Sequence, residues 1–397
     1  MSAPDQAAAQ AAAPVTQAPA SPPPVLEIRD LSISFATESG DVRAVRHADL
    51  SLAPGEIVGL AGESGSGKST LALGACRLLR PPAIITSGSV VYRGRRVGPE
   101  GVEILDLTAH QLRALRWREI SIVFQSAMNA LNPVLRVKDQ LGDVIDAHLN
   151  MTDEEKHERL NTLLDMVGIP RARLRSYPHE LSGGMRQRIM IAMALATEPE
   201  VVIMDEPTTA LDVVVQREIL AEIAQLQKEL KFAVLFITHD LSLLLEIADR
   251  IAMLYGGRMV ETGTGEQIHH RTAHPYTRGL LNSFPSVRGP RRQLAGIPGS
   301  PPDPLDMPPG CPFQPRCRFV RSECATVDMQ LLPAEADAPE HLTACPFVKV
   351  GEAEATDAAA TAQNAAVAAD SATATAENAP VAADSTTATA DNAEVLS

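Results

Sequence analysis

The chain lacks any long run of apolar residues. Its longest, Ile189–Ala196, is far shorter than the ~18–20 residues that a membrane-spanning helix requires. The first 24 residues are mostly Ala, Pro and Gln, and because they contain neither a basic start nor an apolar block, they do not resemble a secretory signal peptide. We therefore expect a cytosolic chain, for which any membrane role comes through a partner.

Positive charge is also scarce, with 35 Lys and Arg against 49 Asp and Glu and a formal net charge of −14. Residues 351–397 contain eight acidic residues and no Lys or Arg, which leaves −6 for the rest of the chain. A mildly acidic folded part argues against nucleic acid as a partner. Both ends of the chain, 1–24 and 351–397, have almost nothing large enough to bury, so we expect them to be disordered.

What the chain does contain is one complete phosphate-binding motif, GESGSGKS at Gly62–Ser69, which matches G-x-x-x-x-G-K-[ST] at every required position. Glycines let backbone N–H groups close around phosphate oxygens because they carry no Cβ. Lys68 supplies a positive charge for the terminal phosphates, and the Ser69 hydroxyl reaches Mg²⁺. The apolar run Glu56–Ala61 predicts a strand before the motif, and Ser69–Leu79 predicts a helix after it, which is the context of a nucleotide site.

Two uninterrupted apolar runs, Val201–Met204 and Phe232–Ile237, predict strands buried on both faces of a parallel sheet. Asp205 and Glu206 follow the first run, and His239 follows the second. Ligands of such sheets lie beyond the carboxyl ends of the strands, so we expect these three side chains to converge on the phosphate loop. An acidic pair or a histidine at a strand end is often only a turn former, but three such groups beside a phosphate loop favour a site.

Alternating apolar and polar residues predict half-exposed strands at Val25–Phe35, Val45–Leu52 and Ser89–Val97. These would form an antiparallel sheet beside the nucleotide strand. Phe35 lies at the end of the first strand. By position alone, it is either an aromatic residue that stacks on adenine or a core residue.

The middle of the chain is predicted to be mostly helical. It begins after the strand Ile120–Phe124, which ends on Gln125. Apolar residues at helical spacing extend over Val137–Met166. The sequence LSGGMRQR at Leu181–Arg188 then opens a further helix, with Ser182 as a natural N-cap and two glycines where a phosphate could approach backbone N–H groups.

Taken in order, these motifs resemble the ABC-type ATPases over about Val25 to Val260. The matching motifs are Walker A at Gly62–Ser69, the Q-loop at Gln125, the LSGG signature at Leu181–Arg188, Walker B with its following acid at Val201–Pro207, the D-loop at Ala210–Asp212 and the switch histidine His239. More narrowly, Gln125–Gln140, the HPYTRGLL segment His274–Leu281 and the Cys-bearing C-terminal extension resemble the ATP-binding subunits of oligopeptide/dipeptide importers.

The resemblance implies an α/β fold: a P-loop ABC ATPase core, with a mostly parallel RecA-like sheet and an antiparallel subdomain, a helical signature subdomain and a small Cys-bearing extension. The corresponding domains are an ATPase domain at 25–265, its helical subdomain at about 126–190, and an extension at 266–350.

The resemblance also implies the residues that bind ATP. They are the adenine-stacking Phe35, the loop and first helical turn, and the Walker B aspartate: Phe35, Gly62, Ser64, Gly65, Ser66, Gly67, Lys68, Ser69, Thr70, Gln125 and Asp205. Within this set, Ser69 and Gln125 would ligate Mg²⁺, with Asp205 assisting through water.

Catalytic roles are implied for Gln125, Glu206 and His239. Glu206 is the candidate general base, and His239 would touch the γ-phosphate and report its loss. Ser182, Gly183 and Gly184 would contact the ATP held by the opposite subunit, and Asp212 belongs to the D-loop.

Subunits of this family work in cytoplasmic pairs under two membrane permeases, fed by an extracytoplasmic binding protein. The resemblance therefore implies a peripheral ATP hydrolase at the cytoplasmic face of the inner membrane, paired with a second ATPase in a heterodimer. Importers of nickel chelates or some sugars have similar subunits and remain an alternative to a peptide importer. A soluble ABC ATPase of DNA repair or translation is disfavoured because the chain has a single ATPase cassette and no heptad repeats. An exporter subunit is disfavoured because of the HPY segment.

Four of the five cysteines follow residue 310, with the spacing C-x5-C-x6-C-x20-C: Cys311, Cys317, Cys324 and Cys345. A reducing compartment argues against disulfides, which leaves zinc or an iron–sulfur cluster, since both accept four thiolates. The spacing lacks the C-x2-4-C knuckles usual in structural zinc sites. Relatives with this extension resemble carriers of a 4Fe-4S cluster, so the resemblance favours that cluster, with zinc as the alternative.

Three histidines, His269, His270 and His274, lie upstream of the cysteines. No Cys or carboxylate spacing accompanies them, so we expect a solvated loop rather than a metal site.

Overall fold

The computed structural model describes residues 22–125, 130–209, 211–283 and 296–348. The ends predicted to be disordered lie outside the described residues, except for residues 22–24. Residues 126–129 of the loop after Gln125 and Ala210 of the D-loop also lie outside them.

Within the described ranges, the main sheet has eight strands in the order β11-β12-β10-β9-β3-β8-β7-β6. In chain order the strands are β3 (Ile57–Ala61), β6 (Ile120–Val123), β7 (Val201–Asp205), β8 (Ala233–Thr238), β9 (Arg250–Tyr255), β10 (Arg258–Thr264), β11 (Leu332–Glu335) and β12 (Ala338–Thr343). Strands β6, β7, β8, β3 and β9 run parallel, as predicted, and every residue of β3, β7 and β8 is buried.

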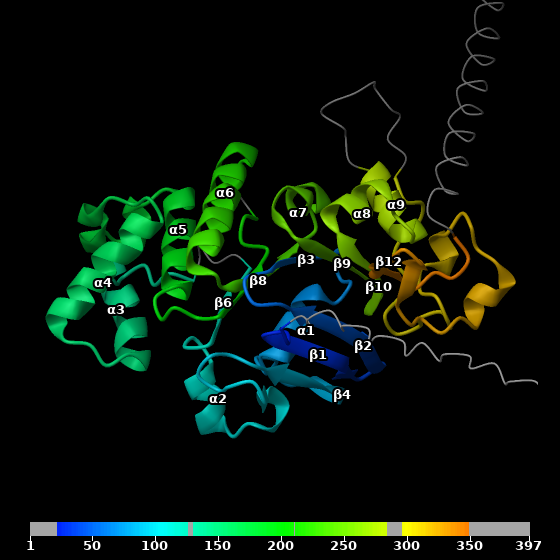
Figure 1. Ribbon diagram of the computed structural model, residues 1–397, viewed down its shortest axis with the longest axis horizontal. Helices are drawn as coiled ribbons and strands as arrows, with labels where there is room; N and C mark the ends of the chain where they lie inside the picture. The colour runs from blue at the N-terminus through cyan, green and yellow to red at the C-terminus, as the bar shows by residue number, and fades with distance from the viewer. Residues whose placement is uncertain (1–21, 126–129, 210, 284–295, 349–397) are drawn as a thin grey trace, which may run out of the picture.

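The main sheet separates two hydrophobic cores, because successive side chains of a strand point to opposite faces. On one face, Val58 and Leu60 of β3 pack with helix α1 (Lys68–Ala75) and the second sheet. On the other face, Ile57 and Ala61 join the core that contains helix α7 (Leu241–Ile247). Figure 1 shows α1 between the two sheets and α7 across the main sheet from it.

The second sheet is antiparallel, as predicted, with the order β2-β1-β4-β5. Its strands are β1 (Leu26–Thr37), β2 (Gly40–Leu52), β4 (Ala83–Tyr92) and β5 (Val102–Glu103). The expected strand at Ser89–Val97 ends earlier, at Tyr92, because the Val97 and Gly98 N–H groups both donate to the Gly94 carbonyl in a turn. Helix α2 (Ala109–Leu115) follows this sheet.

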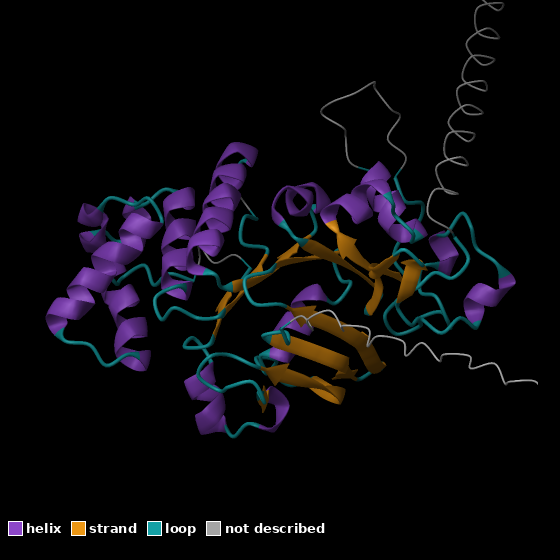
Figure 2. Ribbon diagram, in the orientation of Figure 1, coloured by secondary structure: helices purple, strands orange, loops and turns teal. Residues whose placement is uncertain are grey.

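A helical part lies at one end of the molecule in Figures 1 and 2. It contains α3 (Val137–His148), α4 (Asp153–Met166) and α5 (Gly183–Ala194), and α6 (Val213–Leu230) stands beside it. The expected helical stretch Val137–Met166 is thus two helices. Thr152 starts the second one with a capping box, in which its hydroxyl accepts from the Glu155 N–H and the Glu155 carboxylate accepts from the Thr152 N–H.

The C-terminal extension lies at the opposite end of the molecule from these helices. Strand β12 pairs with β10, with Glu261 opposite Thr343 and Thr262 opposite Leu342. The main sheet therefore continues across the boundary predicted after residue 265. Helices α8 (Gly265–His270) and α9 (Pro275–Asn282) follow β10.

Short 3-10 helices lie elsewhere in the described chain, at Ile104–Asp106, Arg171–Arg175, Pro178–Glu180, Gln314–Arg316 and Ser322–Ala325.

The expectation of a solvated loop around the three histidines is wrong. His269 and His270 are exposed but belong to α8, which Thr264 and Gln267 start with a capping box. His274 is buried, and its Nδ1 accepts from the Tyr276 N–H as the N-cap of α9. A polar side chain that caps a buried helix end looks, in sequence, like a loop residue.

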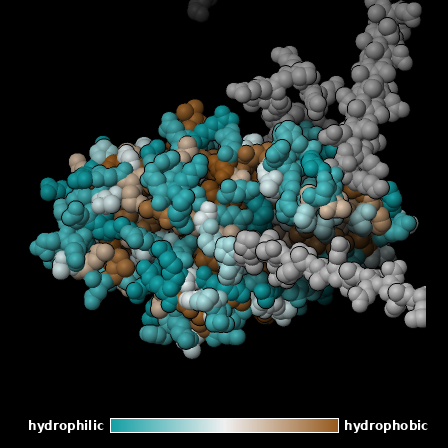
Figure 3. All heavy atoms as spheres, in the orientation of Figure 1, coloured by the Kyte–Doolittle hydropathy of each residue, from teal (hydrophilic) through white to brown (hydrophobic). Residues whose placement is uncertain are grey.

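Hydrophilic residues predominate on the face seen in Figure 3, interrupted by smaller apolar patches. In the part of the chain that the structure describes, no helix has the length and apolar character needed to cross a bilayer.

Candidate functional site

The phosphate loop connects β3 to α1 and owes its shape to glycines. Gly62 and Gly67 have φ values of 153° and 104°, in the region that other residues rarely adopt. An added Cβ would lie 2.2 Å from the Leu254 carbonyl oxygen at Gly62 and 2.4 Å from the Ala44 carbonyl oxygen at Gly67. Larger residues at these two positions would therefore push the loop away from both sheets.

The predicted phosphate-binding lysine lies inside this loop. Lys68 Nζ donates to the carbonyl oxygens of Gly62 at 2.8 Å and Glu63 at 2.9 Å. Burial lowers the pKa of Lys68, while the carboxylates of Glu206 and Asp205 act in the opposite direction. The ammonium group is therefore held at the centre of the loop, with carboxylates nearby.

The remaining loop residues differ in exposure. Ser64 and Gly65 are exposed at the tip, Ser66 is buried, and Thr70 is half-buried in the first turn of α1. The loop thus presents its tip to solvent and packs its Ser66 side against the protein.

Ser69 and Asp205 meet at the end of β7, as predicted. Ser69 Oγ donates to Asp205 Oδ1 at 3.0 Å. Burial, with the neighbouring Glu206 as a smaller contributor, raises the pKa of Asp205, and the Ser69 hydrogen bond opposes this shift. Two oxygen ligands beside a buried lysine suit a hard divalent cation such as Mg²⁺.

Glu206 is held by side chains from three segments. Its Oε2 accepts from Gln125 Nε2 at 2.9 Å and from Thr209 Oγ1 at 3.1 Å, and its Oε1 lies 3.2 Å from His239 Nδ1. The backbone of Glu206 has φ +46°, and its N–H donates to the Ile237 carbonyl. Asp205 thus binds the loop through Ser69, and His239 joins the group through Glu206, while the roles of these three residues stay predictions.

Phe35 lies in β1 and is half-buried, paired with Val42 on β2 and Ala83 on β4. Strand β2 continues from there to Ala44, whose carbonyl oxygen packs against Gly67. The aromatic ring therefore belongs to the sheet that borders the loop, and adenine stacking by Phe35 stays a prediction.

The signature residues do not join this site. Ser182 is exposed at the start of α5, where its Oγ accepts from the Met185 N–H at 3.3 Å. Gly183 and Gly184 form the first turn of α5, which stands apart from α1 in Figure 1. Asp212 is the N-cap of α6, with Oδ1 accepting from the N–H groups of the next turn.

The four clustered cysteines line one pocket, together with His274, Phe313 and other residues of the extension: Cys311, Cys317, Cys324 and Cys345. All are free thiols. Burial raises the pKa of the Cys311 thiol to about 12 and that of Cys317 to about 11. Among the described residues, no three His, Cys, Asp or Glu side chains lie in an arrangement that would hold a metal ion.

Backbone N–H groups point at these sulfurs. The Arg321 N–H donates to Cys324 Sγ at 3.4 Å. Backbone hydrogen bonds two residues downstream, from Phe313, Phe319 and Phe347, lower the thiol pKa values of the other cysteines against the effect of burial. The pocket thus has donors that favour thiolate sulfur.

Two family models match the chain. Residues 45–209 match "ABC transporter", and residues 260–324 match "Oligopeptide/dipeptide transporter, C-terminal region". The oligopeptide transport ATP-binding protein OppD of Salmonella typhimurium is 43% identical over 332 residues, which cover 83% of this chain and 96% of the relative. The dipeptide transport ATP-binding protein DppD of Bacillus subtilis is 43% identical over 329 residues, covering 79% and 96%.

The chain belongs to the oligopeptide/dipeptide ABC transporter ATPases. Solved ABC cassettes confirm the fold of its core. The chain matches the dimeric structure of the bacterial ABC transporter cassette MJ0796 with a TM-score of 0.52 and 28% identity, over 60% of this chain and 98% of that one. It matches cbiO1 from Clostridium perfringens, part of the ABC transporter complex cbiONQ, with a TM-score of 0.52 and 26% identity, over 62% and 90%.

Sequence reasoning missed one feature of this ABC ATPase, the contact between its extension and its phosphate loop. Tyr276 in α9 and Arg316 in the cysteine region both bind Glu63 of the loop. The HPY segment marks α9 in the sequence, but nothing in its pattern indicates which part of the ATPase it touches.

Proposed function

We propose that this chain is the ATP-binding and hydrolysing subunit of a peptide importer, driving a membrane permease pair. The observation that supports the chemistry is the position of Glu206, beside the Ser69–Asp205 pair and within hydrogen-bond distance of Gln125 and His239. The peptide cargo is supported by the relatives, which are oligopeptide and dipeptide transport proteins.

The residues divide the work of hydrolysis. Lys68 and the N–H groups of Gly62–Ser69 hold the β- and γ-phosphates, and Ser69 and Gln125, with Asp205 through water, hold Mg²⁺, which neutralises phosphate charge when bound. Glu206 takes the proton of the attacking water. His239, which follows β8, the strand next to β7, orients the Glu206 carboxylate and touches the γ-phosphate.

Each ATP site is composite. Ser182, Gly183 and Gly184 lie away from this chain's own loop, and Ser182 is exposed, so the signature is available to the ATP of another subunit. The matched cassette MJ0796 forms a dimer. We propose a second, related ATPase as the partner, giving a heterodimer.

The complete transporter would place this pair peripherally at the cytoplasmic face of the inner membrane. Two permeases and an extracytoplasmic binding protein complete it, and the cargo is selected by those partners.

For the cysteine pocket we propose a 4Fe-4S cluster with a structural role. The proposal is supported by four thiols that line one pocket, each with a backbone N–H donor to its sulfur. In the described residues these thiols do not yet form a metal-holding group, so the cluster would draw them closer together. The four ligands would be Cys311, Cys317, Cys324 and Cys345, and the cluster would hold together a proline-rich segment with few apolar residues. Zinc is the alternative occupant.

Reconstitution tests the proposed function. The chain is purified with its permeases and partner ATPase, placed in vesicles and supplied with its binding protein. ATP-dependent uptake of a labelled peptide would support the proposal. Uptake of a nickel chelate or a sugar without uptake of peptides would overturn the peptide assignment, and uptake that needs no ATP would overturn the whole proposal.

A further inference from the structure

Within the described residues, two hydrogen bonds from the C-terminal extension converge on Glu63 of the phosphate loop. The Glu63 N–H donates to Tyr276 Oη at 2.8 Å, and Arg316 Nη1 donates to Glu63 Oε2 at 2.7 Å. The two partners lie 213 and 253 residues further along the chain. Both the backbone and the side chain of Glu63 are therefore held by the extension.

We propose that Tyr276 and Arg316 are positioning residues for ATP binding, which hold the Gly62–Glu63 corner of the phosphate loop from outside. In this way the extension sets the ATP affinity of the site. The inference rests on the proposed function of the loop as the ATP site, and it adds a role for the extension that similarity to other transporters does not assign.

The same corner is held from inside by Lys68. Lys68 Nζ donates to the carbonyl oxygens of Gly62 and Glu63, while the extension binds the Glu63 N–H and carboxylate. A displacement of Glu63 would move both acceptors of the Lys68 ammonium. Because Lys68 places the charge that meets the phosphates, the outer contacts affect ATP binding without touching ATP.

Arg316 is built into the protein as a fixed group. Its side chain is 6% exposed, Nη1 also donates to Tyr255 Oη at 3.1 Å, and Nε donates to the Pro298 carbonyl at 2.9 Å. The Glu63 carboxylate is 22% exposed, so the buried charge of the pair is that of Arg316, and loss of Glu63 would leave it uncompensated. The guanidinium group, held by three partners, therefore gives the Glu63 carboxylate a fixed donor.

Tyr276 is fixed as firmly. It is fully buried, with its ring 4.5 Å from that of Tyr255 and 5.5 Å from that of Phe313, centroid to centroid. Phe313 belongs to the cysteine pocket, and Arg316 immediately precedes Cys317. The elements that carry the cysteines thus also carry the contacts to the loop.

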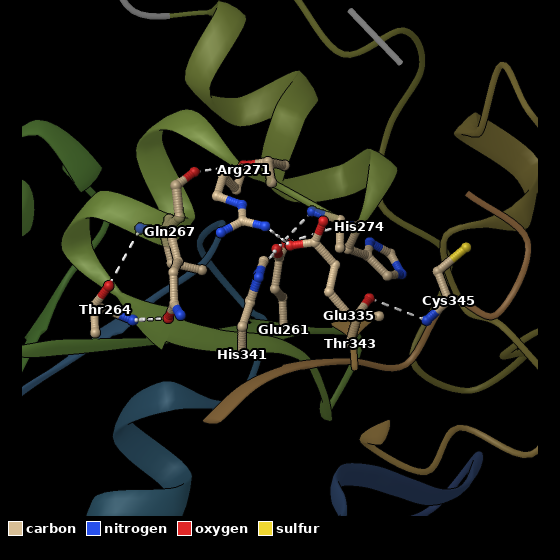
Figure 4. Close-up of polar contacts among 12 residues, drawn as sticks. Glu261, Thr264, Gln267, Arg271, His274, Glu335, His341, Thr343 and Cys345 are labelled. Carbon is tan, nitrogen blue, oxygen red and sulfur yellow. Dashed lines mark hydrogen bonds and ion pairs between the residues drawn. The ribbon is translucent and has the colours of Figure 1, made fainter. Parts of the chain in front are cut away.

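The base of α9 is anchored by a buried carboxylate, shown in Figure 4. Glu261 of β10 accepts from the N–H groups of Ala273 and His274 at 2.7 and 3.1 Å, and it pairs with His341 Nε2 of β12 at 2.9 Å. Glu261 and His341 are both fully buried. Two strands of the main sheet therefore determine where α9 begins and where the Tyr276 hydroxyl reaches.

The test is a nucleotide-binding titration of the full chain with a fluorescent ATP analogue. Tyr276→Phe removes only the acceptor hydroxyl, and Arg316→Gln removes the ion pair. Glu63→Gln is combined with Arg316→Gln to measure the coupling between the two residues. Tyr92→Phe is the matched control, because its buried hydroxyl binds Glu119 and not the loop.

We expect Tyr276→Phe to weaken ATP binding about fivefold and Arg316→Gln about tenfold, in the range of one buried neutral or charged hydrogen bond. Glu63→Gln should add little to Arg316→Gln. In the assembled transporter, KM for ATP should rise while kcat stays within about twofold, which a general loss of folded protein would not produce.

The proposal would be overturned if Tyr276→Phe and Arg316→Gln bound ATP as tightly as the parent. It would also be overturned if they lost no more affinity than Tyr92→Phe. If Arg316→Gln does not fold, Tyr276→Phe decides the outcome alone. This failure is distinct from failure of the proposed function, in which the parent chain itself would bind no ATP.

Discussion

Gln125 and Glu206, 81 residues apart in the chain, are joined by a hydrogen bond of 2.9 Å between Nε2 and Oε2. Gln125 follows β6 and precedes the segment that leads to the helical part, whereas Glu206 follows β7. Neighbouring parallel strands bring the two side chains together at one edge of the sheet. The Gln125 amide therefore fixes one oxygen of the Glu206 carboxylate from the neighbouring strand.

The first prediction concerns Glu206 as general base. Glu206→Gln keeps the size and most hydrogen-bonding capacity of the side chain, but an amide does not accept the proton of water. General-base catalysis contributes about 10²–10⁴ in rate, so ATP turnover of the assembled transporter should fall by that factor while ATP binding persists. Phosphate release under saturating ATP measures the turnover.

Glu100→Gln is the matched control for this substitution, because Glu100 is exposed in the turn before β5. Its turnover should equal that of the parent. Parental turnover in Glu206→Gln would contradict the assignment of the base, provided the partner subunit's site has been inactivated in both samples.

A second prediction follows from the position of the signature. Ser182 and Gly183 lie at the start of α5, away from α1, so a single chain would lack half of each composite site that we propose. The isolated monomer should bind ATP and hydrolyse it slowly, with specific activity rising as the partner ATPase is added. Vigorous hydrolysis by dilute protein that light scattering shows to be monomeric would contradict this.

The nucleotide site was predictable because its signals are local. Gly62–Ser69 carries its own motif, and Asp205 and His239 each end a continuous apolar run, so strand direction alone brings them together. The motif order also predicts that Ser182 contacts the ATP of another subunit, and this stays a prediction.

The extension was harder to predict, because its contacts join residues that are far apart in the chain. Pairing of β12 with β10 depends on a few long-range hydrogen bonds, and the residues around it follow a proline-rich stretch without periodicity. His274 looked like a loop residue, because its role as a buried cap appears only when Glu261 and α9 are in place. The Glu63–Arg316 contact likewise has no sequence signal.

A third prediction uses Cys76, the cysteine outside the cluster. It is buried in the core between the two sheets, and burial raises the pKa of its thiol to about 12. A group with a raised folded-state pKa stabilises fully below its unfolded value, near 9, and loses that contribution as the pH rises towards 12. The free energy of unfolding should therefore fall above pH 9 by about 1.4 kcal/mol per pH unit, the slope for one proton.

Comparison with Cys76→Ala isolates this effect from the titration of Lys and Tyr. The variant should be less stable at pH 7 by roughly 1–2 kcal/mol because of the smaller side chain, and the difference from the parent should shrink above pH 9. Urea denaturation at several pH values measures it. A constant difference between pH 7 and pH 11 would show that Cys76 does not titrate with unfolding.

The last prediction concerns the iron–sulfur cluster proposed for the cysteine pocket. Protein purified without oxygen should be brown, with broad visible absorption, and should release about four irons per chain. Replacing any one of the four pocket cysteines by alanine should reduce the iron content. These cysteines are Cys311, Cys317, Cys324 and Cys345. Cys76→Ala should retain the colour, since Cys76 lies in the other core.

Colourless protein with one stoichiometric zinc would overturn the choice of metal but would agree with the four proposed cysteine ligands. Colourless protein without metal would overturn both. If the cluster is present, removal of its iron by a chelator should also lower the thermal midpoint of the chain, because the iron–sulfur bonds that would link the four cysteines would be lost. An unchanged midpoint after complete removal would show that the pocket keeps its shape without the cluster, and would contradict its structural role.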